Sequence, residues 1–295
     1  MKKEEVSSTT LENNSNGRKE FPQLKLPLIV CLILASILMF ANYLPIILIN
    51  AMKFLGPMVK SHIAIEVGLG MITFLLVLCT CLLFLKIASK KSLDASLKDI
   101  GWTFTKYSLR NFLLGWLFVS IAMILAQFIT SAIGQNDRLM HPFDNSSPIN
   151  ILVGALSGFG AGVLMQGMPE ELIWRGWIMN CMKNKPIKSL LISCIAFGLL
   201  HIVSQGGQEN ILERIVYLID AAAFAFLAGA LSLRFKSLWL AFGVHGGYHL
   251  TNMILSSTPF RSEAPIIWIL QSITWISMAL IVLKGFKGDK VEYLY

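Results

Sequence analysis

Long apolar runs separated by short polar segments dominate the chain after about residue 26. Because about 20 apolar residues are needed to cross a bilayer as a helix, this pattern predicts about eight transmembrane helices. Their expected ranges are 26–50, 63–86, 111–133, 150–168 with a continuation to 182, 187–204, 211–233, 237–256 and 265–283. The predicted fold class is therefore an all-α polytopic membrane protein.

The polar segments divide the chain into three parts. Residues 1–25 hold too few apolar side chains to form a core, so we expect a disordered cytoplasmic N-terminal tail. Residues 26–283 form the predicted eight-helix membrane domain, and residues 284–295 form a short cytoplasmic C-terminal tail. Between the second and third helices, residues 89–111 intersperse Leu, Ile and Trp among polar residues, which indicates a helix on the membrane surface.

The composition supports this class. Apolar residues make up 55% of the chain and charged residues only 14%, whereas a soluble domain would carry about 25% charged residues. The net charge of +8 does not indicate a nucleic-acid partner, because the basic residues lie in short connections and form no basic face. Most of the 25 Lys and Arg residues fall on one side of the membrane if both termini are cytoplasmic, as the positive-inside rule requires. We expect a multi-pass protein of the plasma membrane.

One apolar region contains three charged residues in the sequence PEELIWRGW: Glu170, Glu171 and Arg175. Ionisable groups at membrane depth are costly and usually mark a functional site. Glu171 and Arg175 are four residues apart, so they share a helix face and can form an ion pair. Glu170 points about 100° away, which leaves its carboxyl group free to exchange a proton.

Histidines on two other predicted helices lie at similar depths. With a rise of 1.5 Å per residue, His201, His245 and His249 lie about 12–21 Å inside the membrane, and the glutamates about 16–18 Å. The agreement indicates a shared buried site. Taken singly, each group has a structural alternative: a Glu–Arg strut, or a hydrogen-bonded packing histidine. Asp220, on the sixth helix, could serve the site or be a polar core residue.

Together these residues resemble a known family. EExxxR at Glu170, Glu171 and Arg175, AFGLLH ending at His201, and SLWLAFGVH ending at His245 are similar in order and spacing to motifs of the Abi or CPBP family of intramembrane proteases. That family includes the CAAX-prenyl endopeptidases. The resemblance covers about residues 150–256 and implies a CAAX-like intramembrane endopeptidase that hydrolyses a peptide bond.

The resemblance also implies a catalytic role for each motif residue. The residues concerned are Glu170, Glu171, Arg175, His201, His245 and His249. Glu170 with His201 would bind and deprotonate a water molecule, and Glu171 with Arg175 would orient the site. The two histidines of the seventh helix would donate to the developing oxyanion. Here the chain departs from the family, which usually has Asn or Asp at the position of His249.

The sequence leaves open whether a metal takes part. Glu170, His201 and His245 could form an open three-ligand site for a divalent metal such as zinc, whereas a water held by Glu and His alone needs none. The expected partners are the lipid bilayer and a peptide or membrane-protein substrate that enters from the cytoplasmic side.

Two other classes of protein remain possible from the sequence. A non-catalytic membrane scaffold, such as a bacteriocin-immunity or regulatory protein, could use the same fold, and His249 is the feature that favours it. A transporter with a buried carboxylate relay would have paired broken helices and repeat symmetry, which the sequence does not display.

Overall fold

The computed structural model describes most of the chain after its polar N-terminal segment. The described residues are 27–41, 43, 44, 47, 63–89, 92–133, 148–204, 206–256, 265–288 and 290–293. All regular elements within them are helical, which confirms the all-α fold class. The predicted tail at residues 1–25 lies outside the described residues, so its disorder stays a prediction, as do the boundaries of the three predicted parts.

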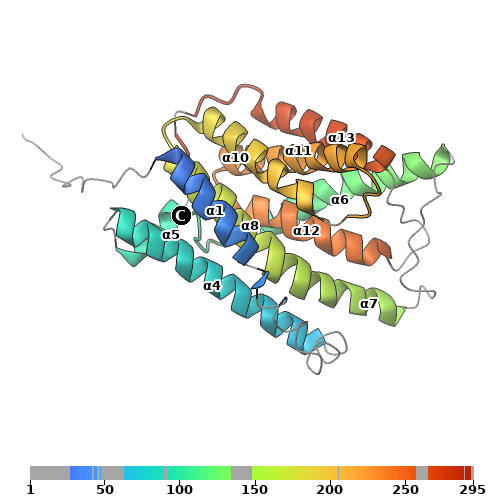
Figure 1. Cartoon of the computed structure of the whole chain (residues 1–295), viewed down its shortest axis with the longest axis horizontal. Helices are drawn as coiled ribbons and strands as arrows, with labels where there is room; N and C mark the ends of the chain where they lie inside the picture. Colours follow the sequence, from blue (N-terminus) through green and yellow to red (C-terminus); the bar gives the residue numbers. More distant parts are fainter. Residues whose placement is uncertain are drawn as a thin grey trace, which may run out of the picture.

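The helices follow the predicted apolar segments closely (Figure 1). In chain order they are α1 (Leu28–Ala41), α4 (Ile63–Ser89), α5 (Leu93–Asp99), α6 (Ser108–Ala132), α7 (Pro148–Ser157), η1 (Gly158–Gly167), α8 (Met168–Glu171), η2 (Leu172–Ile178), α9 (Met179–Cys181), α10 (Pro186–Leu200), η3 (His201–Val203), α11 (Ile211–Phe235), α12 (Leu238–Ser256) and α13 (Pro265–Leu283). The elements η1 and η2 are π-helical, and η3 is a single 3₁₀ turn. The segments from α7 to α9 follow one another without a break and form one long helix.

The chain is an integral membrane protein. Five of the described helices are long and apolar enough to cross a bilayer. They are Ser108–Ala132, Ile151–Cys181, Pro186–Val203, Ile211–Phe235 and Pro265–Leu283. Shorter apolar helices lie at Leu28–Ala41 and Gly68–Thr80, and α12 interrupts its apolar residues with His245, His249 and Asn252. The total of about eight crossings and the cytoplasmic location of both termini stay predictions.

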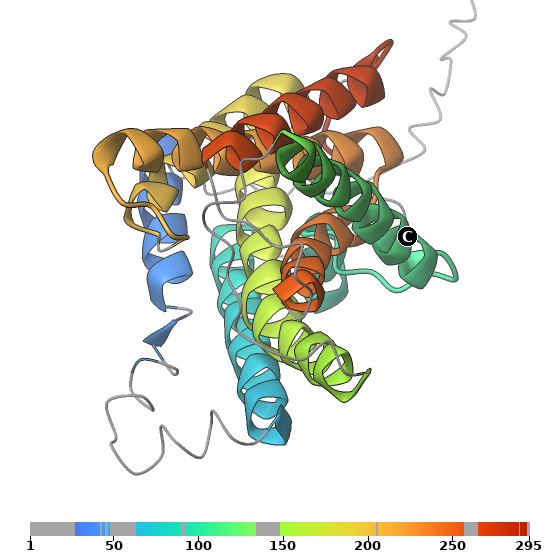
Figure 2. The same ribbon diagram turned by 90° about the vertical axis from the view of Figure 1, so that its right-hand side faces the viewer.

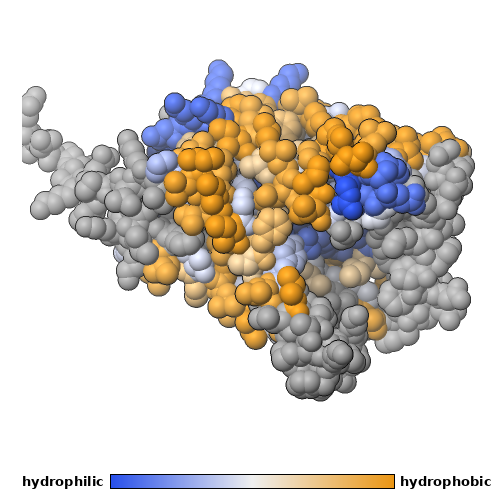
Figure 3. Space-filling model, viewed as in Figure 1, coloured by the Kyte–Doolittle hydropathy of each residue, from blue (hydrophilic) through white to orange (hydrophobic). Residues whose placement is uncertain are grey.

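Large apolar side chains cover the outer faces of α6, α10 and α13. Phe128, Ile195 and Ile281 are 72%, 58% and 72% exposed. Figure 3 shows one face of the molecule, on which most of the described surface is hydrophobic. A soluble monomer rarely exposes apolar patches of this extent, whereas lipid tails cover them without cost. These faces are therefore the lipid-facing sides of the helices.

Helix α12 lies inside the bundle, against α6, α11 and η1 (Figures 1 and 2). Its crossing with α6 is close because glycines stand at the contact. A Cβ atom at Gly243 would collide with the carbonyl oxygen of Phe112, and one at Gly247 would lie 2.6 Å from the Trp116 ring. Small residues allow helix backbones to approach in this way within membranes. The crossing holds in place the turn of α12 that carries His245.

Two π-helical segments flank the glutamate pair in the long helix. Segment η1 ends at Gly167 and η2 begins at Leu172, so Met168–Glu171 is a short α-helical step between them. Pro169, which has no N–H to donate, lies near the start of this step. Because π-helical hydrogen bonds span five residues, they shift the direction of the side chains relative to a regular α-helix. Such segments often occur at functional sites, and here they adjoin the two acids.

The predicted surface segment contains the helix α5. The side chain of Ser92 accepts a hydrogen bond from the Ala95 N–H at its start, which is the usual N-cap arrangement. After the helix, Gly101 turns the chain with a φ of +76°, a conformation that favours glycine. The predicted helix is thus confirmed, while its position at the membrane surface stays a prediction.

The end of the chain packs against the helices. The Val291 N–H donates to the Lys183 carbonyl at 2.7 Å, and the Tyr293 hydroxyl donates to the Arg175 carbonyl at 2.5 Å. Burial raises the pKa of Tyr293, so its hydroxyl group stays protonated and remains a donor. The predicted C-terminal tail therefore includes a segment that holds the helix carrying Arg175.

Candidate active site

A cavity of about 790 Å³ lies between α10, α11, α12 and α13, next to the residues that follow α1. His201 lines it from the end of α10, and His245 and His249 line it from α12. The three histidines that the sequence placed at similar depths therefore share one cavity. Tyr43, which follows α1, also lines its wall.

Glu171 is the centre of a buried charge network behind this cavity. Its Oε1 atom lies 3.0 Å from Arg175 Nη1 and 2.8 Å from His245 Nδ1. Both Glu171 and Arg175 are completely buried, and the Arg175 Nη2 group also donates to the Ala225 carbonyl at 2.9 Å. The predicted ion pair between residues four apart is therefore confirmed. Glu171 also links this ion pair to α12, because it contacts His245.

The contact with Glu171 orients the His245 ring. Because a carboxylate can only accept, Nδ1 of His245 is the protonated nitrogen, which leaves Nε2 of the neutral ring with a lone pair. Such a carboxylate partner fixes both the tautomer and the orientation of a functional histidine. The Phe224 ring packs edge-on against His245, with ring centroids 5.1 Å apart, and further restricts its movement.

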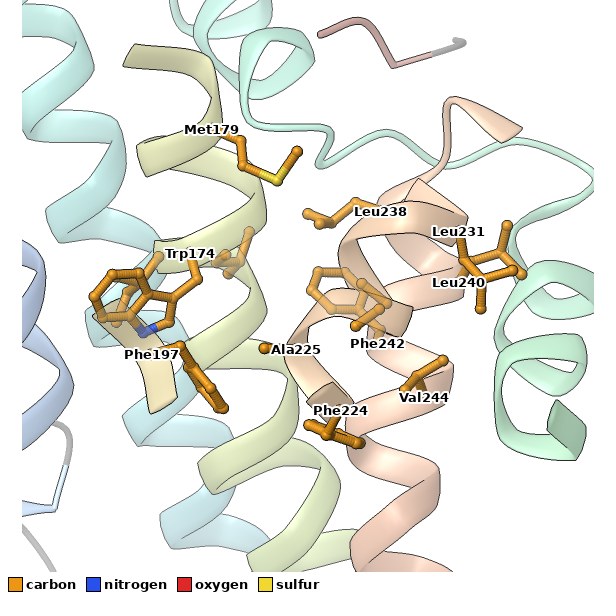
Figure 4. Close-up of a cluster of buried hydrophobic side chains, with 14 of the residues drawn as sticks. Trp174, Met179, Phe197, Phe224, Ala225, Leu231, Leu238, Leu240, Phe242 and Val244 are labelled. Carbon is orange, nitrogen blue, oxygen red and sulfur yellow. The ribbon is translucent and has the colours of Figure 1, made fainter. Parts of the chain in front are cut away.

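Aromatic rings enclose Arg175 on its other side. Its guanidinium carbon lies 5.0 Å from the centroid of the Phe197 ring, within cation–π range. Trp174 packs edge-on against Phe197 at a centroid distance of 6.1 Å, and Figure 4 shows these two side chains next to each other. The charged network is therefore sealed by apolar groups, which strengthens electrostatic contacts within it.

Glu170 points away from this network, as its position in the helix predicted. Its Oε1 atom accepts a hydrogen bond of 2.6 Å from the Tyr43 hydroxyl. Its Oε2 atom lies 3.8 Å from His245 Nε2 and has no hydrogen-bond partner among the described residues. The side chain is completely buried. One carboxylate oxygen is thus held in place, and the other faces the lone pair of His245.

His201 ends α10 and presents one nitrogen to the cavity. Its Nδ1 atom lies 2.8 Å from the Phe197 carbonyl oxygen, so Nδ1 carries the proton and Nε2 has the lone pair. The Phe197 ring also packs on the His201 ring at a centroid distance of 4.4 Å. Both contacts explain the FxxxH spacing, because a residue and the one four later lie on the same face of a helix.

His249, which replaces the usual Asn or Asp of the family, also belongs to the site. Its ring stacks on that of His245, with centroids 5.3 Å apart and an interplanar angle of 24°. Its Nε2 atom is buried without a hydrogen-bond partner in the described part of the chain. A Cβ atom added at Gly162 of η1 would collide with the Cβ of His249. The absence of a side chain at Gly162 therefore makes room for this imidazole.

We expect Gly162→Ala to reduce peptide turnover strongly and to have a smaller effect on thermal unfolding. The added methyl group must displace His249, and overpacking of this kind costs roughly 1–3 kcal/mol. The matched control is Gly68→Ala, because a Cβ atom at Gly68 meets nothing within 4 Å. Thermal unfolding and peptide turnover should be measured for both variants in detergent. Equal turnover by the two variants would contradict the role assigned to Gly162.

Tyr43 is a site residue that the sequence motifs did not reveal. It lies 127 positions before Glu170, in an apolar stretch with no charged neighbours. No local spacing rule connects two residues so far apart. Asp220, for which the sequence left two roles open, lines the same cavity.

The possible role of Glu170, His201 and His245 as metal ligands stays a prediction. In the described portion of the chain, no group of three or more His, Cys, Asp and Glu side chains could hold a metal ion. No catalytic role is therefore assigned to a metal.

Comparison with protein families gives one match. Residues 150–251 match the family described as type II CAAX prenyl endopeptidase Rce1-like. This range contains the glutamate pair, Arg175 and all three cavity histidines. No curated protein matches the chain. The family match confirms, over residues 150–251, the resemblance drawn from the three motifs.

Proposed function

We propose that the chain is an intramembrane endopeptidase that uses Glu170 and histidine side chains to activate water. The observation that carries this proposal is the pair formed by Glu170 Oε2 and His245 Nε2. The two atoms are 3.8 Å apart, and Oε2 has no hydrogen-bond partner among the described residues. One water oxygen can lie within hydrogen-bond distance of both atoms.

Glu170 acts as the general base in this mechanism. It takes a proton from the bound water as the water oxygen attacks the carbonyl carbon of the scissile peptide bond. When the carbon–nitrogen bond breaks, Glu170 returns the proton to the leaving amine. His201, whose ring also lines the cavity, lies beside this water. Tyr43 keeps the carboxyl group in the required position through its hydrogen bond to Oε1.

His249 supplies the oxyanion contact in place of the usual Asn or Asp. His245, which was predicted to share this role, does not donate here, because its proton is on Nδ1 and its Nε2 has a lone pair. The buried Nε2 of His249 has no partner in the described part of the chain, so a proton on this nitrogen is available to the tetrahedral intermediate. A preoriented donor of this kind is commonly worth a factor of about 10²–10³ in kcat. Glu171 and Arg175 contribute indirectly, because they fix the His245 ring on which His249 stacks.

The substrate is a membrane-associated protein or a peptide. The predicted topology places the site within reach of the cytoplasmic half of the bilayer, and we propose that substrates enter from that side of the plasma membrane. The match to a CAAX endopeptidase domain does not by itself require a prenylated substrate. Comparative analysis of membrane and secreted peptides from cells with wild-type or Glu170→Ala protein tests the proposal. A precursor that accumulates only with the variant would support it and identify the substrate.

Activity is expected to survive exhaustive chelation. In the proposed mechanism, Glu170 and histidine nitrogens hold the water. Removing divalent metals should therefore leave turnover within about twofold of that of the untreated protein. Removal of an essential metal would cause a much larger loss of turnover. The measurement is cleavage of the identified precursor by detergent-solubilised protein after dialysis against a strong chelator. Loss of turnover that added zinc restores would show instead that a metal is required.

A further inference from the structure

A second polar cluster lies on the wall of the cavity, and the proposed mechanism does not use it. Asp220 of α11 is only 3% exposed, and it lines the same cavity as His201, His245 and His249. A buried acid inside a membrane protein is costly, and by default it marks a functional position.

The protein itself compensates Asp220 poorly. The Ser272 hydroxyl lies 2.9 Å from Asp220 Oδ1, but the same hydroxyl also lies 2.7 Å from the Trp268 carbonyl oxygen. A serine hydroxyl has a single proton, whereas an ionised carboxylate accepts up to about four hydrogen bonds. No Lys or Arg is among the described residues that line the cavity. Most of the acceptor capacity of Asp220 is thus left for a group that enters the cavity.

Two aromatic residues line the cavity together with Asp220. Tyr217 lies one turn before Asp220 on α11, and its ring packs edge-on against Trp268 of α13 at a centroid distance of 5.3 Å. Both rings line the cavity, as does the amide of Gln271. Aromatic faces attract cations through the ring quadrupole. A carboxyl group next to aromatic side chains is therefore suited to bind a dehydrated cation.

The subsite is close to the reacting groups. The Tyr217 ring lies 6.4 Å from the His201 ring, and Tyr217, Asp220 and His201 line the same cavity. An extended peptide advances about 3.3 Å per residue. A side chain bound at Asp220 would therefore belong to a residue within about one to three positions of the scissile bond.

We propose that Asp220, Tyr217 and Trp268 form a specificity subsite for a positively charged group of the substrate, either an ammonium or a guanidinium. This inference rests on the proposed function, and it adds a substrate class: peptides with a Lys or Arg residue, or a free amino terminus, near the cleaved bond. The cation supplies the hydrogen bonds and the charge that Ser272 cannot provide. A neutral side chain would supply neither the charge nor these hydrogen bonds, so it should bind less tightly.

The test uses the full-length protein in lipid nanodiscs and N-acetylated, quenched-fluorescence peptide libraries. Each library position is fixed in turn as Lys, norleucine or Glu. At one position, wild-type protein should show a kcat/KM for Lys about tenfold to a hundredfold above that for norleucine, the factor expected for a charged hydrogen-bond partner. Asp220→Asn should lower the ratio of kcat/KM for Lys over norleucine to about one, and Asp220→Glu should keep the wild-type preference for Lys. Asp220→Lys should reverse the preference, so that peptides with Glu at this position are cleaved best. Libraries with free amino termini distinguish a terminal ammonium from a side chain.

Binding measurements separate this proposal from the proposed function. The labelled Lys and norleucine peptides are titrated against Glu170→Ala protein with and without Asp220→Asn, and fluorescence anisotropy reports their binding. A Lys preference that depends on Asp220, without cleavage by wild-type protein, would support the subsite and refute the peptidase. Cleavage by wild-type protein with no preference for Lys at any position would refute the subsite and leave the peptidase standing. The wild-type comparison needs no variant to fold.

Discussion

Replacing Glu170 with alanine is expected to abolish peptide-bond cleavage, with kcat lowered by at least about 10²–10⁴-fold, the range for loss of a general acid–base group. Glu170 is the carboxyl group whose Oε2 atom faces His245 Nε2, whereas Glu171 contacts Nδ1 of the same ring. The variant should still fold, because the change removes a buried carboxylate rather than adding a charge. Turnover of the accumulated precursor by purified wild-type and variant protein is the measurement.

Two further variants make this result interpretable. Glu170→Gln keeps an oxygen that can accept from Tyr43, so it should preserve the fold and still lack activity, which separates proton transfer from packing. Glu292→Ala is the matched control, because it removes a carboxylate that pairs with Lys236 and Lys290 outside the site. Its turnover should equal that of wild type. Wild-type turnover by Glu170→Ala would overturn the assignment of the general base.

The parts of the site that follow local spacing could be predicted from the sequence. Glu171 and Arg175 pair because residues four apart share a helix face, and hydropathy alone located the helices that carry His201 and His245. The number of residues between each histidine and the start of its helix predicts a depth in the membrane similar to that of the glutamate pair. The shared cavity of the three histidines follows from the same geometry.

Contacts between distant segments could not be predicted in this way. Tyr43 reaches Glu170, and Tyr293 reaches the Arg175 carbonyl, through packing that no periodic pattern encodes. The π-helical segments η1 and η2 are also invisible to hydropathy, because a change in hydrogen-bond register alters no residue type. Asp220 shows the same limit, since its sequence position does not reveal that it lines the cavity of the histidines.

Arg175→Ala is expected to give the largest loss of stability of any variant considered. Removing one partner of a buried ion pair leaves the other charge uncompensated and commonly costs about 3–5 kcal/mol. Here Glu171 would lose its cation while completely buried, and the Ala225 carbonyl would lose its donor. Thermal unfolding in detergent is the measurement. The matched control is Lys98→Ala, which breaks an exposed pair with the same four-residue spacing to Asp94 and should change stability little.

Removing both charges separates the structural role of the pair from its role in the site. The double variant Glu171→Gln/Arg175→Met has no isolated buried charge, so it should recover most of the stability lost in Arg175→Ala. It should remain inactive, because His245 Nδ1 would no longer be held by a carboxylate and the ring could turn away from Glu170. A double variant with wild-type turnover would show that the network only supports the helices. One no more stable than Arg175→Ala would show that the loss comes from packing around Phe197 rather than from the uncompensated charge of Glu171.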